Sequence, residues 1–209
     1  LHPEIKSSDR SQFIISNDDL GVGTPKEKYK RNIEAIKVLK TCERENRFAT
    51  PEEQKVLSEY VGWGGLSQTF NENNEQWSNE YEELKLLLTE EEYRNAQEST
   101  LTAFYTPPIV IRTMYKALEN MGFKSGNILE PSCGIGNFIG MLPETLNTSN
   151  IYGIEIDSIS GRIARQLYQK SSIAIEGFEK TELPDSFFDV AIGNVPFGEF
   201  RVNDKRYDK

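Results

Sequence analysis

The first stretch whose residues could do chemistry is LEPSCGIGNF, residues 129–138. An apolar run ends at Glu130 and leads through Gly134 and Gly136 into a segment with helical character. Glycines here let the backbone turn sharply and approach a ligand without a clash from a side chain. Glu155 ends the next apolar run, 21 residues after Gly134, where an acid accepts hydrogen bonds from ribose hydroxyls in nucleotide-binding folds. The pattern predicts a site for a cofactor that contains a nucleoside.

The charges around the glycines indicate which cofactor. Dinucleotide sites usually have a third glycine in Gly-x-Gly-x-x-Gly, where this chain has Ile139. A pyrophosphate also favours a helix N-terminus without a carboxylate nearby, whereas Glu130 stands beside this one. A carboxylate suits S-adenosylmethionine (AdoMet), which carries a sulfonium, an ammonium and a ribose. The residues therefore favour AdoMet over NAD, and a βαβ unit with a merely tight turn is the structural alternative.

The second reactive stretch is GNVPFG, residues 193–198, which follows the last apolar run. An exocyclic amine of a base is a poor nucleophile, because its lone pair is delocalised into the ring. Asn194 Oδ1 and the main-chain carbonyl of Val195 could accept its two N–H groups and stabilise the charge that develops during methyl transfer. Pro196 stiffens the turn, and Phe197 offers a flat face for a flipped base. This chemistry needs no histidine, metal or thiol.

The composition agrees with such a reaction. The only histidine is His2, and Cys42 and Cys133 lack the spacing of metal ligands. The sequence has neither a signal peptide nor an apolar run long enough to cross a membrane, so we expect a cytoplasmic protein with reduced thiols. A net charge of −9 predicts that this segment does not grip DNA alone, because duplex affinity rests on Lys and Arg.

The first hundred residues are predicted to be helical. Ser/Thr-x-x-Glu capping signals at residues 24–27 and 50–53 predict helices that run to about residues 44 and 60. The same signal at residues 89–92 predicts a short fourth helix. A further helix is predicted over residues 79–88. In VGWGG, residues 61–65, a helix-ending turn with Trp63 as a packing anchor is favoured over a ligand loop.

The second half alternates strands and helices. Thr106 is predicted to cap a helix that places Val110, Met114 and Leu118 on one face. Apolar runs at residues 127–130, 151–156, 171–178 and 186–194 predict parallel strands, with helices after the first two. We therefore predict a helical region over residues 1–100 and an α/β, doubly wound domain over residues 101–209.

These motifs, in this order, resemble those of gamma-type N6-adenine DNA methyltransferases: FYTPPIV, EPSCGIGNF, YGIEID, EGF and GNVPFG. The arrangement is similar to the methyltransferase segment of large methylase–helicase proteins of phages, plasmids and conjugative elements. The resemblance implies a Rossmann-like AdoMet-dependent methyltransferase fold with strand order 3-2-1-4-5-7-6, of which the chain holds the first four strands. A piece of a longer protein is thus expected, with DNA bound through parts that follow and with weak or no activity alone.

The resemblance also implies roles for individual residues. Tyr105 and Thr106 would lie at the methionine end of AdoMet, and Ile156 and Phe178 would sandwich its adenine. The segment 194–197 would hold the target adenine. The full predicted cofactor-binding set is Tyr105, Thr106, Glu130, Pro131, Gly134, Gly136, Glu155, Ile156 and Phe178.

Two positions depart from the family pattern. Val195 replaces the usual first proline of Asn/Asp-Pro-Pro-Tyr/Phe, and Gly177 replaces an Asp that commonly contacts the cofactor's adenine amine. Two alternatives therefore stay open beside the DNA methyltransferase. One is a methyltransferase that acts on RNA or on a protein glutamine amide. The other is a non-catalytic scaffold with a degenerate methyltransferase fold.

Overall fold

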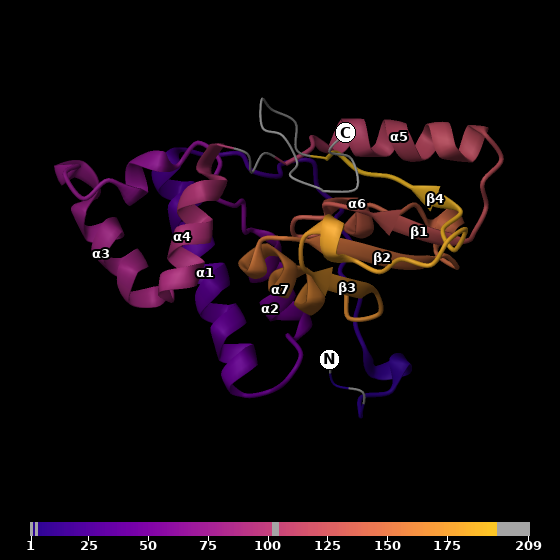
Figure 1. Cartoon of the computed structure of the whole chain (residues 1–209), viewed down its shortest axis with the longest axis horizontal. Helices are drawn as coiled ribbons and strands as arrows, with labels where there is room; N and C mark the ends of the chain where they lie inside the picture. The colour runs from indigo at the N-terminus through magenta and orange to yellow at the C-terminus, as the bar shows by residue number, and fades with distance from the viewer. Residues whose placement is uncertain (1, 3, 102–104, 196–209) are drawn as a thin grey trace.

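The second half of the chain folds around a parallel sheet. The computed structural model describes residues 2, 4–101 and 105–195. Strands β1 (Asn127–Glu130), β2 (Asn150–Glu155), β3 (Ser172–Ile175) and β4 (Val190–Ala191) lie in the order β3-β2-β1-β4 (Figure 1). Each neighbouring pair is parallel. This is the order of the first four strands of the fold that the motifs imply, so the predicted α/β fold class is confirmed.

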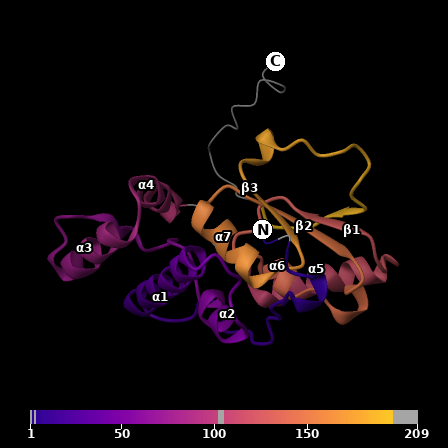
Figure 2. The ribbon, with the colours of Figure 1, turned by 90° about the horizontal axis from the view of Figure 1, so that it is seen from below.

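Three helices lie on one face of this sheet (Figure 2): α5 (Pro108–Asn120), α6 (Asn137–Gly140) and α7 (Ser158–Leu167). On the other side, the Tyr152 ring of β2 packs edge-on against Phe187 and Phe188, with ring centroids 5.4 and 5.3 Å away. The connection between β3 and β4 therefore supplies aromatic cover for the face that these helices leave open.

The first hundred residues are helical, as predicted. Helices α1 (Pro25–Arg44), α2 (Pro51–Ser58), α3 (Ser78–Leu87) and α4 (Glu90–Glu98) form this region. The predicted capping boxes at Thr24, Thr50 and Thr89 are confirmed. In each, the threonine oxygen accepts the N–H of the glutamate three residues on, and that glutamate accepts the threonine N–H. Single 3-10 turns occupy Ser7–Asp9, Ser67–Phe70, Glu75–Trp77, Ser99–Leu101, Glu144–Leu146 and Phe178–Lys180.

The helical region and the sheet share one apolar core. Helices α1 and α2 lie beside α7 (Figures 1 and 2). Leu39 and Leu57 from the helical region and Ile163 and Leu167 from α7 are fully buried in the same cluster. Trp63 is 1% exposed there and packs against Tyr29, Tyr60 and Phe70, so the favoured packing role of the VGWGG turn is confirmed. The predicted boundary near residue 100 stays a prediction.

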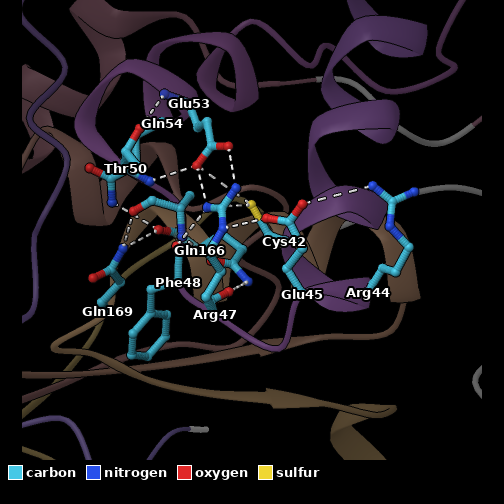
Figure 3. A network of polar contacts seen from close by, with 11 residues as sticks. Cys42, Arg44, Glu45, Arg47, Phe48, Thr50, Glu53, Gln54, Gln166 and Gln169 are labelled. Carbon is cyan, nitrogen blue, oxygen red and sulfur yellow. Dashed lines mark hydrogen bonds and ion pairs between the residues drawn. The ribbon is translucent and has the colours of Figure 1, made fainter.

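A buried polar network joins the same two parts (Figure 3). Gln166 Oε1 accepts the Ala49 N–H at 2.7 Å, and Gln169 Nε2 donates to the Ala49 carbonyl at 2.9 Å. Gln54 Nε2 donates to the carbonyls of Gln166 and Leu167 at the end of α7. The glutamines thus satisfy backbone groups that packing has removed from water, as buried polar groups require.

The N-terminal arm is tied to the sheet half by backbone hydrogen bonds. Phe13 N donates to the Leu167 carbonyl at 2.9 Å, and Ile15 N donates to the Gly140 carbonyl at 2.8 Å. Ile15 is buried against α5 and α6. The arm therefore forms part of the packed structure around α6.

Helix α5 differs from its prediction in two ways. Thr106 is not the cap: Pro107 occupies that position with extended angles (φ −58°, ψ 141°), and no side chain caps the helix. Of the predicted face, Leu118 is buried and Met114 packs half-buried against the same core, whereas Val110 is exposed. Ile111 and Tyr115 supply the rest of the buried side. The strands after it also differ in length, since β3 and β4 are shorter than their apolar runs.

Both cysteines, Cys42 and Cys133, are free and buried. Among the residues described, no helix is both long and apolar enough to cross a bilayer.

Candidate cofactor and acceptor site

The glycine loop after β1 is fastened to the end of β2 by hydrogen bonds. Gly134 N donates to Glu155 Oε2 at 2.6 Å, and Asp157 N donates to Glu155 Oε1 at 2.7 Å. Cys133 N donates to the Ile154 carbonyl at 2.8 Å. The predicted pair of Gly134 and Glu155 is therefore in direct contact, and the carboxylate organises both loops at the carboxyl edge of the sheet.

The loop needs its glycines for two reasons. Gly134 and Gly136 have φ angles of +55° and +87°, which L-residues with side chains rarely adopt. A Cβ on Gly134 would lie 2.8 Å from Tyr105 Cε1, and one on Gly136 would overlap the fully buried ring of Tyr168. The backbone thus approaches both aromatic rings more closely than any side chain would allow.

Glu130 is a buried acid without a partner. It is 3% exposed, and its Oε2 has no hydrogen-bond partner among the described residues. Burial raises the pKa of the Glu130 carboxyl, and the nearby Glu155 raises it further. Burial also raises the pKa of Glu155, although the N–H groups of Asp157 and Gly134 oppose this. Two crowded, desolvated carboxyls form a site that a cationic group would stabilise.

Two apolar side chains stand exposed at the same edge of the sheet. Ile156 follows β2 and is 72% exposed, and Phe178 follows β3 and is 51% exposed. Large apolar side chains with this exposure are candidates for contact with a ligand. Tyr105 lies between this edge and the core. Its pKa is raised chiefly by burial and also by Asp157 and Glu155.

The acceptor stretch leaves β4 beside the loop after β1. Ser132 Oγ donates to the Asn194 carbonyl at 3.3 Å. A Cβ on Gly193 would lie 3.4 Å from Glu130 Cγ and Pro131 Cδ. Asn194 and Val195 are exposed. The backbone of Gly193 and Asn194 thus lies beside the loop that carries Glu130. Pro196 and Phe197 lie outside the described residues.

Some residues around the site were not predicted from the sequence. Asp157 caps α7 by accepting the Ser160 N–H at 2.9 Å, and its own N–H holds Glu155. The Asp-x-x-Ser pattern before an apolar segment was a signal for this cap. The contact of Tyr168 with Gly136 could not be predicted from neighbouring residues, because Tyr168 comes from the end of a helix far along the chain. Thr106 and Pro131 are each half-buried, and Pro131 lies close to Gly193.

No protein-family model matches the sequence. The chain is 30% identical over 163 residues to Defense against restriction protein B of Escherichia phage P1, covering 77% of this chain and 6% of that protein. It is 36% identical over 94 residues to the type II methyltransferase M.CvrRI of Paramecium bursaria Chlorella virus XZ-6E, which covers 45% of this chain and 24% of that protein. It is 28% identical over 126 residues to the modification methylase CviBIII of Paramecium bursaria Chlorella virus NC1A, which covers 60% of this chain and 32% of that protein.

The chain therefore spans under a third of the length of each of these relatives. Among solved structures, it is similar to a candidate class I AdoMet-dependent methyltransferase from Listeria monocytogenes. That match has a TM-score of 0.42 and 17% identity over 83% of this chain and 60% of the other, a likeness too distant to argue from. Two of these three relatives are named as a methyltransferase and a modification methylase, which confirms the predicted resemblance to methyltransferases. All three come from viruses.

Proposed function

We propose that this chain is the cofactor-binding part of an AdoMet-dependent DNA methyltransferase that methylates N6 of adenine. Two of the relatives are named as a methyltransferase and a modification methylase. The observation that carries the proposal is the contact between the two reactive stretches. Asn194 lies against the loop of Glu130 and Ser132, at the carboxyl ends of the adjacent strands β1 and β4.

The residues present fit AdoMet. The unpartnered Glu130 carboxylate suits the ammonium of the methionine part, because burial makes an opposite charge favourable there. Each Glu155 oxygen accepts one backbone N–H and retains capacity for a ribose hydroxyl. The exposed Ile156 and Phe178 would hold the adenine between them, and Tyr105 and Thr106 would close the methionine end.

Asn194 and Val195 would act on the acceptor amine. AdoMet, when bound, supplies an electrophilic methyl group on a positively charged sulfur. Asn194 Oδ1 and the Val195 carbonyl would accept the two N–H groups of adenine N6 and stabilise the positive charge that develops on this nitrogen. Because Val195 contributes its main-chain carbonyl, the Pro-to-Val departure preserves the acceptor. A base in duplex DNA must leave the stack to reach this position.

Transfer of a labelled methyl group tests the proposal. The full-length protein is incubated with labelled AdoMet and, separately, unmethylated DNA, RNA or a glutamine-containing protein. We expect label in DNA, recovered as N6-methyladenine. Removing a charge-stabilising acceptor by Asn194→Ala should lower the rate by about 10²-fold or more and leave AdoMet affinity unchanged. The matched control is Asn147→Ala, an exposed asparagine after Glu144–Leu146, which should change neither quantity.

Each other outcome has a definite meaning. Label found only in RNA or protein would replace the DNA substrate with one of those acceptors. If calorimetry detects no AdoMet binding, the non-catalytic scaffold is correct. An Asn194→Ala variant that transfers methyl groups at the wild-type rate would remove Asn194 from the mechanism.

A further inference from the structure

Arg162 on α7 connects the first turn of that helix to the helical region. Its Nε donates to the Ser158 carbonyl at 3.0 Å, one turn back along α7. Long side chains of a helix point toward its N-terminus, which places this guanidinium beside the first turn. Its Nη1 donates to the two oxygens of Glu43 on α1 at 3.2 and 3.1 Å, and its Nη2 donates to Glu92 on α4. One side chain therefore joins three helices.

Glu92 is the buried centre of this group of charges. It is 7% exposed. Its Oε1 accepts from Arg162, and its Oε2 accepts Lys40 Nζ at 2.8 Å and the Thr89 N–H at 2.9 Å. Burial raises the pKa of Glu92, but the bonds from Lys40, Thr89 and Arg162 outweigh it and lower the pKa overall. A buried carboxylate held by three donors makes a firmer link than an ion pair at the surface.

The positions of two of these charges are not explained by their own helices. The dipole of a helix favours cations near its C-terminus and anions near its N-terminus. The Arg162 guanidinium lies beside the N-terminal turn of α7, and Glu43 stands in the last turn of α1. Each charge is therefore unfavourable to its own helix and becomes favourable through the contact between the two helices.

The segment that Arg162 contacts carries the groups of the cofactor-binding edge. Ser158, whose carbonyl accepts from Arg162, directly follows Asp157. The Asp157 N–H donates to Glu155 Oε1 at 2.7 Å, and Glu155 Oε2 accepts the Gly134 N–H at 2.6 Å. Every step from α1 and α4 to the glycine loop is thus a hydrogen bond or a short run of covalent backbone.

We propose that Arg162 is a positioning residue of the site, through which α1 and α4 hold the turn between β2 and α7. It acts on Glu155 through Ser158 and Asp157. A turn that is held before the cofactor arrives does not have to be ordered during binding, which favours affinity. The hold on the turn needs only the hydrogen bonds above, whereas the effect on AdoMet rests on the proposed function.

Two Arg→Gln variants separate positioning from general stability. Arg162→Gln removes the charged fork and keeps a polar side chain, and Glu92 retains its two other donors. The matched control is Arg47→Gln. Arg47 donates to both oxygens of Glu53 at 2.6 and 2.7 Å, an ion pair of the same kind that lies within the helical region.

Hydrogen–deuterium exchange supplies the first measurement and calorimetry the second. In the full-length protein without ligand, Arg162→Gln should accelerate amide exchange over residues 155–161 about tenfold, the effect of one hydrogen bond to a charged group. AdoMet binding should weaken about fivefold, because part of this loss is recovered when the ligand orders the turn. The number of binding sites should not change. Arg47→Gln should lower thermal stability and leave local exchange and affinity unchanged.

Calorimetry also distinguishes a purely structural role. If Arg162 only stabilised the fold, its loss would reduce the number of binding sites and leave the affinity of the folded molecules unchanged. Glu43→Gln provides a second, milder variant, because the Glu43 side chain is 34% exposed. It should loosen residues 155–161 to a smaller extent, and it carries the same prediction if Arg162→Gln does not fold. The two effects should not add, since both act through one guanidinium.

The results distinguish the two proposals. Unchanged exchange over residues 155–161 in the folded variant would overturn the hold on the turn, and additive effects of Arg162→Gln and Glu43→Gln would do the same. Faster local exchange with unchanged AdoMet affinity would overturn the role of Arg162 in the site. Faster local exchange in a protein whose wild type binds no AdoMet would support the hold on the turn and reject the proposed function.

Discussion

Gly136 provides the sharpest test of how the glycine loop is built. Its φ of +87° nearly equals the +90° of Gly122, which follows α5. The two sites differ in their surroundings. A Cβ on Gly136 would lie 2.8 Å from Tyr168 Cδ2 and closer still to Cε2, whereas one on Gly122 would meet nothing within 4 Å. Both Gly136→Ala and Gly122→Ala therefore force a residue with a Cβ into a left-handed backbone conformation. Only Gly136→Ala adds a steric clash with a neighbouring side chain.

The expected magnitudes follow from these two contributions. A left-handed conformation costs a residue with a Cβ about 1–2 kcal/mol, and we expect this loss of unfolding free energy for Gly122→Ala. Overpacking a full core adds about 1–3 kcal/mol. The Tyr168 ring has no room to retreat, since it is 0% exposed and its hydroxyl already lies against Gly140. We therefore expect Gly136→Ala to lose about 2–5 kcal/mol.

Urea unfolding followed by circular dichroism measures both variants. For a chain of this size, each kcal/mol corresponds to about 2–4 °C in melting temperature, so thermal unfolding offers a second readout. We also expect Gly136→Ala to lose AdoMet affinity, because the loop must move away from Tyr168. Equal destabilisation by the two substitutions, within about 0.5 kcal/mol, would refute the close packing of Gly136 on Tyr168.

Three further predictions concern stability. Folding raises the pKa of Glu130 and of Glu155, so their contribution to stability is fully present below the unfolded pKa near 4.5 and declines as pH rises through the folded pKa values. Glu130→Gln should lessen this decline of stability with pH, measured as the urea midpoint at several pH values. Equal dependence of the midpoint on pH in variant and wild type would contradict this prediction. Gln166→Leu should cost about 1–3 kcal/mol in urea unfolding, because it leaves the buried Ala49 N–H unpaired; a neutral effect would count against the network. Thr50→Ala should cost about 1 kcal/mol through the lost cap of α2 in thermal unfolding, and an unchanged melting temperature would argue against that cap.

Local signals in the sequence were sufficient where a structure depends on neighbouring residues alone. The capping boxes at Thr24, Thr50 and Thr89 need only two side chains three positions apart, and all three were predicted. The placement of Gly134 and Glu155 at one edge of the sheet was predicted, because parallel strands bring their carboxyl ends together, but the hydrogen bond between them was not. Such features follow from the residue types and their spacing.

Helix α5 shows where local reasoning needed one more rule. A residue before proline avoids the helical region, and Pro107 precedes Pro108, so Pro107 was the natural cap. The apolar run at residues 109–111 also allowed more than one choice of buried face. Ile109 and Val110 are 70% and 43% exposed, whereas Ile111 is buried. Only packing against β1 and α6 selects among them.

The shared core has a consequence for the site that no motif expressed. Helix α7 begins at the turn that holds Glu155, and its middle and end are buried against α1 and α2 through Ile163 and Leu167. The position of Glu155 therefore depends on packing with residues that carry no recognisable chemistry. The piece from residue 101 onward would keep every predicted motif and still lack the surface that holds α7. The motifs identify the groups that are proposed to bind and react, and the helical region holds α7 in place beside them.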